Sequence, residues 1–319
     1  RDREGEFLPV VVPKHLSRGL SIERLVISLY AKGMSVSDIE SEMQEIYGIN
    51  LSTSAISIIT NKVSQAASEW QNRPLESLYM IVWMDGIVFK VRENGKVINK
   101  TVYLCVGLNK DGLKEVLGMW VGKNESAAFW MGVLTDLKAR GVENILVTVT
   151  DNLNGFTETI KSVFPSSTTQ ICVVHQIRNS CRYVVWKEKK EFTSDLKNIY
   201  NAPTKEAAKM ELDNFEQKWG SKYPYAIRSW RNNWEELTVF FDFPVEIRKI
   251  IYTTNLIENL NGKIRKYTKN KLSFPNDDAL KKSVYLAITE IEKKWYQPIW
   301  NWALIFNQFI TIFENRIQV

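Results

Sequence analysis

The stretch that decides the fold is residues 79–121, which read YMIVWMDGIVFKVRENGKVINKTVYLCVGLNKDGLKEVLGMWV. Three runs rich in β-branched and aromatic residues are separated there by Asn94-Gly95 and Asp111-Gly112, dipeptides that favour tight hairpin turns. The pattern predicts an antiparallel meander of three strands. The predicted strands are 79–92, 97–108 and 113–121.

After the meander, helical and strand patterns alternate. Asn124 is placed to cap a helix that ends at Gly141. The elements expected next are a strand at 145–150, a short helix at 156–163, a strand at 170–174 and a helix from His175 onward. The resulting order, β-β-β-α-β-α-β-α, is that of the ribonuclease H fold, an α/β fold with a mixed five-stranded sheet.

Helical segments precede, interrupt and follow this sheet. Three short helical patterns lie between Ser21 and Trp70, and Ser35 with Asp38 forms a capping box for the second. We therefore expect five parts: a linker at 1–20, a three-helix, helix-turn-helix-like domain at 21–72, the first part of the ribonuclease-H-like domain at 73–190, an all-helical insertion at 191–250, and C-terminal helices at 251–319.

The role of the three-helix domain stays open at this point. Its last helix has the place of a helix that enters the DNA major groove. However, residues 21–70 hold three basic and six acidic side chains, a local charge of −3. DNA contact and simple packing or dimerisation are equally compatible with that pattern.

The bulk composition limits the classes of function. Forty-two Lys and Arg against 36 Asp and Glu give a net charge of +6, which permits a polyanionic partner. The three cysteines form no disulfide framework or zinc motif and favour a reducing intracellular compartment. No apolar run approaches the length needed to span a membrane. The chain starts with Arg rather than Met, so we expect it to be a fragment of a longer protein.

Two acidic residues lie where a metal site is expected. Asp85 interrupts an apolar strand, where an unpaired carboxylate would be costly to bury. Asp151 follows the fourth strand directly, at the strand end where α/β sheets place ligands. In the ribonuclease H topology these two strands are neighbours, so the carboxylates would repel each other unless a metal ion lay between them.

Glu258 is the third acidic candidate, on a helix that starts near Thr254 or Asn255. Asn255, Glu258, Gly262, Arg265 and Lys269 share one helical face, with Asn261 at its border. Residues 257–271 hold five basic residues, one of which is Lys266, and one acidic residue. The local charge is therefore +4. The carboxylate suits a metal ion, and the basic strip suits DNA phosphates.

A second basic tract begins at Arg178 and Arg182 and continues through Lys187, Lys189 and Lys190. It is a candidate for phosphate contact, against the alternative of an ordinary solvated helix. Trp230 and Trp234, one helical turn apart, could stack on an unpaired base. Packing inside the helical insertion is the alternative that we favour for them.

Four motifs give the chain a resemblance to the Mutator-type family of bacterial insertion-sequence transposases. The motifs are IVWMDG at 81–86, VTVTDNLNGF at 147–156, CVVHQIRN at 172–179 and YTTNLIE at 252–258. The resemblance implies an Asp-Asp-Glu active site, which falls here on Asp85, Asp151 and Glu258. It also implies a Cys-x-x-His signature at Cys172 and His175, where the histidine either fixes the strand end or touches the scissile phosphate or the metal site.

The resemblance also implies a reaction and its partners. Two Mg²⁺ ions, with Mn²⁺ able to substitute, would be held by the three carboxylates while DNA is cut and then joined. The substrates would be double-stranded element ends and target DNA, the pathway copy-out and paste-in, the active form at least a homodimer, and the location the bacterial cytoplasm at the nucleoid. The alternatives are a catalytically inactive DNA-binding regulator and a nuclease that cuts without joining.

Overall fold

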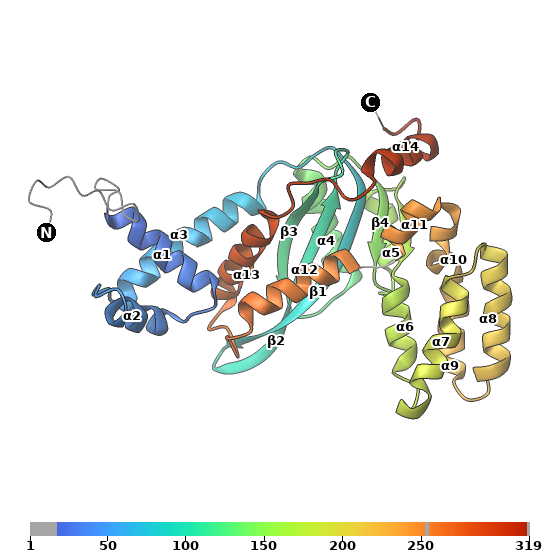
Figure 1. Cartoon of the computed structure of the whole chain (residues 1–319), viewed down its shortest axis with the longest axis horizontal. Coiled ribbons are helices and arrows are strands. Elements are labelled where there is room, and N and C mark those ends of the chain that lie inside the picture. The colour runs from blue at the N-terminus through green and yellow to red at the C-terminus, as the bar shows by residue number, and fades with distance from the viewer. Residues whose placement is uncertain (1–17, 253–254, 318–319) are drawn as a thin grey trace, which may run out of the picture. The chain divides into compact units, whose positions relative to one another are not determined.

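The structure, a computed structural model, describes residues 18–252 and 255–317. Nearly all of the expected linker at 1–20 therefore lies outside the described residues, as does Thr254 before the Glu258 helix. Five strands form one sheet in the order β3-β2-β1-β4-β5 (Figure 1). The strands are β1 (Leu78–Glu93), β2 (Lys96–Leu108), β3 (Lys114–Gly122), β4 (Asn144–Thr150) and β5 (Thr168–Ile171).

The sheet is mixed, as the sequence predicts. Asn94 and Gly95 join β1 to β2 with positive φ angles of 48° and 78°, the backbone that a two-residue hairpin requires. Strand β2 pairs with β3 in antiparallel fashion, whereas β1 pairs with β4, and β4 with β5, in parallel. This α/β arrangement is consistent with a ribonuclease-H-like fold.

Helices make up the rest of the described chain. Before the sheet lie α1 (Arg18–Ala31), α2 (Val36–Glu45) and α3 (Thr53–Gln71). Between the strands lie α4 (Ala127–Ala139) and α5 (Phe156–Val163). After β5 come α6 (Val173–Cys181), α7 (Lys189–Tyr200), α8 (Lys205–Trp219), α9 (Pro224–Asn232), α10 (Trp234–Leu237), α11 (Val245–Ile251), α12 (Asn255–Thr268), α13 (Asp277–Glu292) and α14 (Trp302–Ile312), with the 3-10 turns η1 (Trp186–Glu188) and η2 (Val239–Asp242).

Three elements, α4, β5 and α6, differ by more than one residue from the sequence-based expectation. Helix α4 is capped by Ser126 rather than Asn124, because the Ser126 side chain accepts a hydrogen bond from the Phe129 N–H. Strand β5 covers 168–171 instead of 170–174, and α6 starts at Val173 instead of His175. Val173 and Val174 have the β-branched side chains typical of strands, but they form the first turn of α6.

The chain forms two compact units. The small unit contains, of the described chain, residues 18–70, 90–98 and 263–290; the sheet unit contains 71–89, 99–252, 255–262 and 291–317. These units divide the chain differently from the five expected parts, whose boundaries stay a prediction. Over the stretch that the structure describes, every helix is too short or too polar to cross a membrane.

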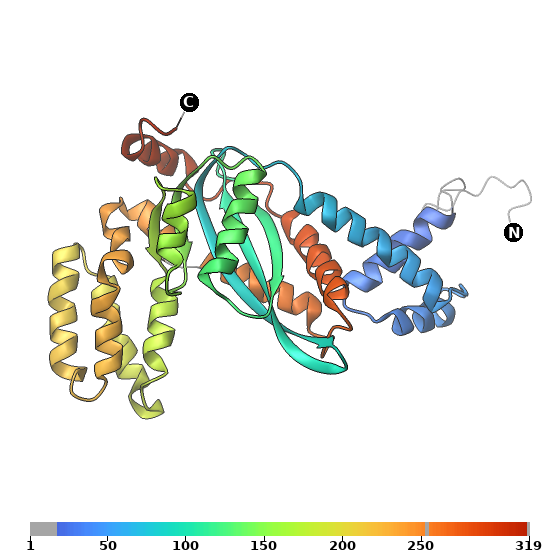
Figure 2. The same cartoon turned by 180° about the vertical axis from the view of Figure 1, so that it is seen from behind.

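The core of the sheet unit lies between the sheet and α4 with α5, which cover one face of the sheet in Figure 2. Trp130 of α4 is fully buried and stacks on Phe156 of α5, with ring centroids 4.7 Å apart. Tyr103 of β2 meets the edge of the same indole at 5.4 Å. This aromatic cluster fixes both helices on the sheet.

Buried hydrogen bonds join the helices after β5 to the sheet and to one another. The Gln170 side chain of β5 is fully buried; it donates to the Leu237 carbonyl at 2.9 Å and accepts from the Phe240 N–H at 2.7 Å. Trp230 of α9 donates to the Ser180 hydroxyl of α6 at 3.0 Å. Trp230 and Trp234 are both buried, so the packing interpretation of these two tryptophans is confirmed.

In the small unit, α1, α2 and α3 share an apolar core to which α13 also contributes. The expected capping box at Ser35 and Asp38 is present. Helix α3 packs toward α13, since the Ser64 hydroxyl donates to Asp278 at 2.9 Å. Lys271 is partly buried: its ammonium lies 4.1 Å from the ring centre of Tyr30 and donates to the Ser283 hydroxyl at 3.0 Å.

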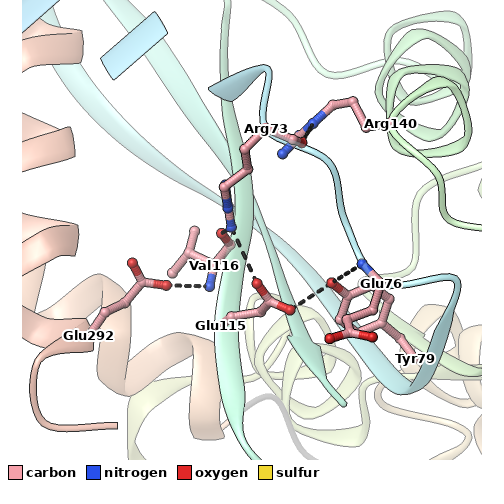
Figure 3. Close-up of polar contacts among 7 residues, drawn as sticks. All are labelled: Arg73, Glu76, Tyr79, Glu115, Val116, Arg140 and Glu292. Atoms are coloured by element: carbon pink, nitrogen blue, oxygen red, sulfur yellow. Dashed lines mark hydrogen bonds and ion pairs between the residues drawn. The ribbon is translucent and has the colours of Figure 1, made fainter. Parts of the chain in front are cut away.

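A polar network holds the start of β1 to β3 (Figure 3). The fully buried Tyr79 donates its hydroxyl proton to Glu115 at 2.6 Å, and the same oxygen accepts from the Glu76 N–H at 3.2 Å. Arg73 reaches the other Glu115 oxygen at 3.4 Å. Burial, followed by the charge of Glu115, raises the pKa of Tyr79 far above its usual value, so the phenol stays a proton donor.

Two further contacts extend this network (Figure 3). Arg140, at the end of α4, donates to the Arg73 carbonyl at 3.0 Å. Glu292 accepts from the Val116 N–H at 2.7 Å, and burial raises the pKa of this carboxyl. The network therefore connects the chain entering the sheet with β3, with α4 and with the segment after residue 290.

Replacing Tyr79 with Phe should destabilise the sheet unit by about 1 to 3 kcal/mol, because Glu115 and the Glu76 N–H each lose a buried partner. Urea unfolding followed by circular dichroism measures the change. Tyr296→Phe is the matched control, since that ring is 74% exposed and its variant should stay within about 0.5 kcal/mol of the wild type. Equal stability of the two variants would contradict this role of the network.

The partly buried ammonium of Lys271 predicts a pH dependence of stability. Burial, assisted by the charge of Lys282, lowers the pKa of Lys271 from 10.5 to about 8. Between these two values the unfolded chain binds more protons than the folded chain, so the contribution of Lys271 to stability must rise with pH. The unfolding free energy of the wild type, relative to Lys271→Met, should rise by about 2 to 3 kcal/mol from pH 7 to 10.5. A flat difference would show that the ammonium is solvated.

Candidate active site

Asp85 and Asp151 lie next to each other on the central strands. The parallel register pairs Ile81 with Val147 and Trp83 with Val149, so two residues further on it brings Asp85 opposite Asp151. Asp85 is still within β1, whereas Asp151 is the first residue after β4. The strand pairing therefore places the two carboxylates side by side, as the sequence predicts.

Two donors orient the Asp85 carboxylate. One oxygen accepts from the Gly86 N–H at 2.8 Å, and the other accepts from the side-chain amide of Asn261 on α12, also at 2.8 Å. A side chain at residue 86 would approach the Thr101 methyl group to 2.7 Å, too close for a Cβ atom. Glycine at this position thus lets β1 pass close to β2 while its N–H fixes the carboxylate.

Burial and like charges make the ionised carboxylates costly. Burial, then the charges of Glu125 and Asp85, raises the pKa of Asp151 to about 7, against the opposing effect of His175. Burial also raises the pKa of Asp85; the charges of Glu258 and Glu125 act in the same direction. Without an added cation, these side chains cannot all be ionised at low cost.

Glu258 lies on α12 and is held by cationic side chains of α6. Arg178 donates to both Glu258 oxygens, one of them at 3.2 Å, in a bidentate ion pair. The His175 imidazole lies 3.9 Å from Glu258. Glu258 therefore belongs to the same neighbourhood as Asp85, but its oxygens are taken up by an arginine.

His175 faces the carboxylates. Burial would lower its pKa, but contact with the Cys172 side chain and the charges of Asp85 and Asp151 outweigh that effect and raise the pKa to about 9. The imidazole is therefore cationic at neutral pH. Its charge compensates part of the negative charge of the neighbouring carboxylates.

The side chains around Asp85 suit a hard cation. All the carboxylates here offer oxygen donors, which Mg²⁺ and Mn²⁺ prefer. The side-chain oxygen of Asn261 is buried with no hydrogen-bond partner in the part of the chain that the structure describes, although its amide nitrogen binds Asp85. Among the same described residues, no three His, Cys, Asp or Glu side chains are arranged to hold one metal ion. Glu258 is instead paired with Arg178.

The remaining candidates for DNA contact lie in different places. Asn255 is exposed at the start of α12, and Arg182 is exposed at the end of α6. Arg265, Lys266 and Lys269 are exposed in the small unit, on or just after the second half of α12.

Two of the residues of the predicted face and strip do not point to solvent. Lys271, counted in the charge of the strip, is instead packed on Tyr30. Asn261 is turned toward Asp85, so the structure gives it a role in orienting a carboxylate rather than an exposed position on the strip.

Two site residues were missed from the sequence. Glu125, in the connection from β3 to α4, acts electrostatically on both Asp85 and Asp151, and its carboxylate accepts from the Trp130 indole at 2.8 Å. The fully buried Gln176 of α6 accepts from Asn152 and donates to Ser229 of α9 at 2.8 Å. The position of Glu125, directly after the expected helix cap Asn124, was the sequence feature that could have indicated it. No sequence feature indicated Gln176.

Comparison with known proteins identifies clear relatives. Residues 1–298 match the family described as "Transposase, Mutator family". A probable transposase for an ISRM3-like insertion sequence element from Sinorhizobium fredii is 42% identical over 99% of this chain and 79% of its own length. The transposase for insertion sequence element ISRM3 from Rhizobium meliloti has the same identity and coverage.

A more distant relative covers a similar share of the chain. The transposase for insertion sequence element IS256 in transposon Tn4001 from Staphylococcus aureus is 27% identical over 92% of this chain and 76% of its own length. Among solved structures, the crystal structure of NurA with manganese aligns over 82% of this chain and 66% of that chain. Its TM-score of 0.13 and sequence identity of 14% are too low to indicate a shared fold.

Proposed function

We propose, from the premise that this chain belongs to the Mutator family of transposases, that it is a metal-dependent nucleotidyltransferase that cuts and joins DNA at insertion-sequence ends. The observation that carries this proposal is the pair Asp85 and Asp151. They lie side by side at the centre of the sheet, half-buried, with raised pKa values. Burying two carboxylates in this way is unfavourable unless a cation compensates them.

The residues proposed to hold the metal are Asp85, Asp151 and Glu258, with two Mg²⁺ ions, or Mn²⁺, as the bound cations. The donor oxygens and the orphaned side-chain oxygen of Asn261 support this assignment. When bound, such ions lower the pKa of an attacking water or hydroxyl and stabilise the departing oxygen of the phosphodiester.

The protein side chains have separate tasks in this proposal. Asn261 and the Gly86 N–H keep Asp85 in a fixed orientation. Arg178, exposed and paired with Glu258, can exchange that carboxylate for a DNA phosphate, because guanidinium groups bind both in the same bidentate way. The exchange would release Glu258 toward the aspartates when DNA arrives. His175, cationic at neutral pH, would remain to balance the charge of the cluster.

The wider reaction is proposed by analogy with the relatives, which are transposases of insertion sequences. Cleavage would free a 3′-hydroxyl at an element end, and the same site would then use that hydroxyl to attack a second phosphodiester. A copy-out, paste-in pathway, an active homodimer that pairs two ends, and a location at the bacterial nucleoid complete the proposal. A regulator without catalysis, or a nuclease without joining, are the alternatives to be distinguished.

Asp85→Asn should lower Mg²⁺-dependent cleavage and joining of element-end DNA by about a thousand-fold or more, since it removes one charge from the metal site. The assay follows labelled element-end duplexes on denaturing gels. Asp111→Asn, the same change at an exposed turn residue, is the control and should retain wild-type activity.

A second substrate separates the alternatives. With a preformed 3′-hydroxyl end, a transposase links the donor to target DNA, whereas a nuclease leaves the two unlinked. A regulator would bind the ends and produce neither product. Full activity of Asp85→Asn would remove the proposed active site.

Metal binding should be visible without catalysis. We expect saturating Mn²⁺, at about a hundred times its dissociation constant, to stabilise the wild type by about 2 to 3 kcal/mol. Asp151→Asn should lose most of this effect, yet be more stable than the wild type in chelator, because it removes a half-buried charge beside Asp85. Thermal unfolding with and without Mn²⁺ tests both expectations, again with Asp111→Asn as the control. An identical Mn²⁺ response of the two variants would disprove the metal assignment.

A further inference from the structure

Three large aromatic side chains stand exposed around the end of α6 and the start of α9. Trp186 is 85% exposed, Tyr225 64% and Tyr183 57%. The rings of Tyr183 and Tyr225 stack on each other, with centroids 6.0 Å apart and planes inclined by 24°. Tyr183 lies just after α6 and Tyr225 lies in α9, and the views in Figures 1 and 2 agree that the end of α6 and the start of α9 lie close together. We call Tyr183, Trp186 and Tyr225 the aromatic platform.

Cationic side chains border the platform. Arg182 and Lys187 flank Tyr183 and Trp186 in the sequence, and the Arg228 guanidinium lies 5.6 Å from the ring centre of Tyr225. All three cations are exposed, and within the described ranges none of them forms an ion pair with a carboxylate.

The acids closest in sequence already have partners. Glu188 is bound by Lys222 and by the Tyr223 hydroxyl. Glu191 and Asp195 both pair with Lys218, each at 2.7 Å. The platform therefore presents aromatic faces with unneutralised positive charge, a combination that attracts a polyanion with flat, apolar groups.

The segments that carry the platform are held by buried contacts. Tyr223, just before α9, is buried and meets the ring of Phe192 at 5.7 Å. Trp230 fastens α9 to Ser180, only three residues before Tyr183. These buried contacts keep the exposed rings in place before any ligand binds, which reduces the entropic cost of stacking.

Helix α6 connects the platform to the candidate active site. His175, Arg178 and Arg182 follow helical spacing and share one face of α6. The first two contact Glu258, and the third borders the platform. Arg182 lies about 10 Å further along the helix axis than His175. A DNA strand leaving the active site along this face would reach the aromatic rings within a few nucleotides.

We infer that the aromatic platform binds unpaired bases of the DNA strand that leaves the active site, stacking them on Trp186, Tyr183 and Tyr225 while Arg182 and Arg228 contact phosphates. This deepens the proposed function and rests on it. Duplex DNA hides its base faces and cannot use such rings, whereas every unpaired base offers one. The charge around the rings favours a nucleic acid over an apolar protein surface, because arginine and lysine are left without carboxylates to pair with.

The test measures DNA affinity by fluorescence anisotropy in the presence of a chelator, so that it does not depend on catalysis. The two probes are a labelled blunt duplex and the same duplex with an oligothymidylate extension of about ten nucleotides. We expect the wild type to prefer the extended probe. Trp186→Ala should bind that probe about 10-fold more weakly and the blunt duplex unchanged; adding Tyr225→Ala should increase the loss.

Trp300→Ala is the matched control, because Trp300 is 87% exposed in the same sheet unit, outside the platform. It should bind both probes like the wild type, and Trp186→Phe should recover most of the lost affinity. Wild-type binding by the Trp186→Ala, Tyr225→Ala double variant would overturn the inference. So would equal losses on both probes, or a change of oligomeric state in sedimentation that accounts for the loss, since the platform would then be a protein interface. Because Asp85→Asn activity is assayed separately, failure here leaves the proposed active site unaffected.

Discussion

The parallel pairing of β1 with β4 is the constraint on which the rest of the site depends. It brings Asp85 and Asp151 into adjacent positions, where hydrogen bonds from Gly86 and Asn261 hold one of the two carboxylates. The sheet supplies the free energy for this arrangement through the apolar residues around it, because the carboxylates themselves oppose it. The aromatic cluster of α4 and α5 packs on one face of that sheet, and the network around Glu115 holds the start of β1 to the edge strand β3.

The helices after β5 also contact this site. Helix α6 carries His175 and Arg178 toward the carboxylates, and its buried Gln176 joins Asn152, next to Asp151, to Ser229 of α9. The helical segment is therefore hydrogen-bonded to the loop that holds the second aspartate. A displacement of α9 would therefore be transmitted to that loop through the side-chain amide of Gln176.

Much of the fold could be predicted because its signals are local. Asn94-Gly95 allows essentially one kind of turn, and the apolar runs on either side of it must then pair. The two aspartates followed from strand order and from the resemblance. The boundaries near Val173 were wrong, since two valines favour a strand by themselves and only the tertiary structure makes them helical.

The contacts of the site could not be predicted in the same way. Arg178 and Glu258 are 80 residues apart in the chain, and Asn261 is 176 residues from Asp85. No periodicity relates such positions, so Arg178 and Asn261 were interpreted only as phosphate contacts. The exposure of Trp186 could not be predicted either. The helical spacing of Trp230 and Trp234 made those two residues the candidates for base stacking, yet they are buried.

The register of β1 against β4 has a consequence for how copies of such a gene decay. Side chains alternate between the two faces of a strand, so the loss or gain of one codon inside either strand would turn every following residue to the opposite face. One carboxylate would then lie above the sheet and the other below it. We therefore expect single-codon insertions or deletions before Asp85 in β1, or within β4, to separate the two carboxylates wherever no bulge absorbs the change.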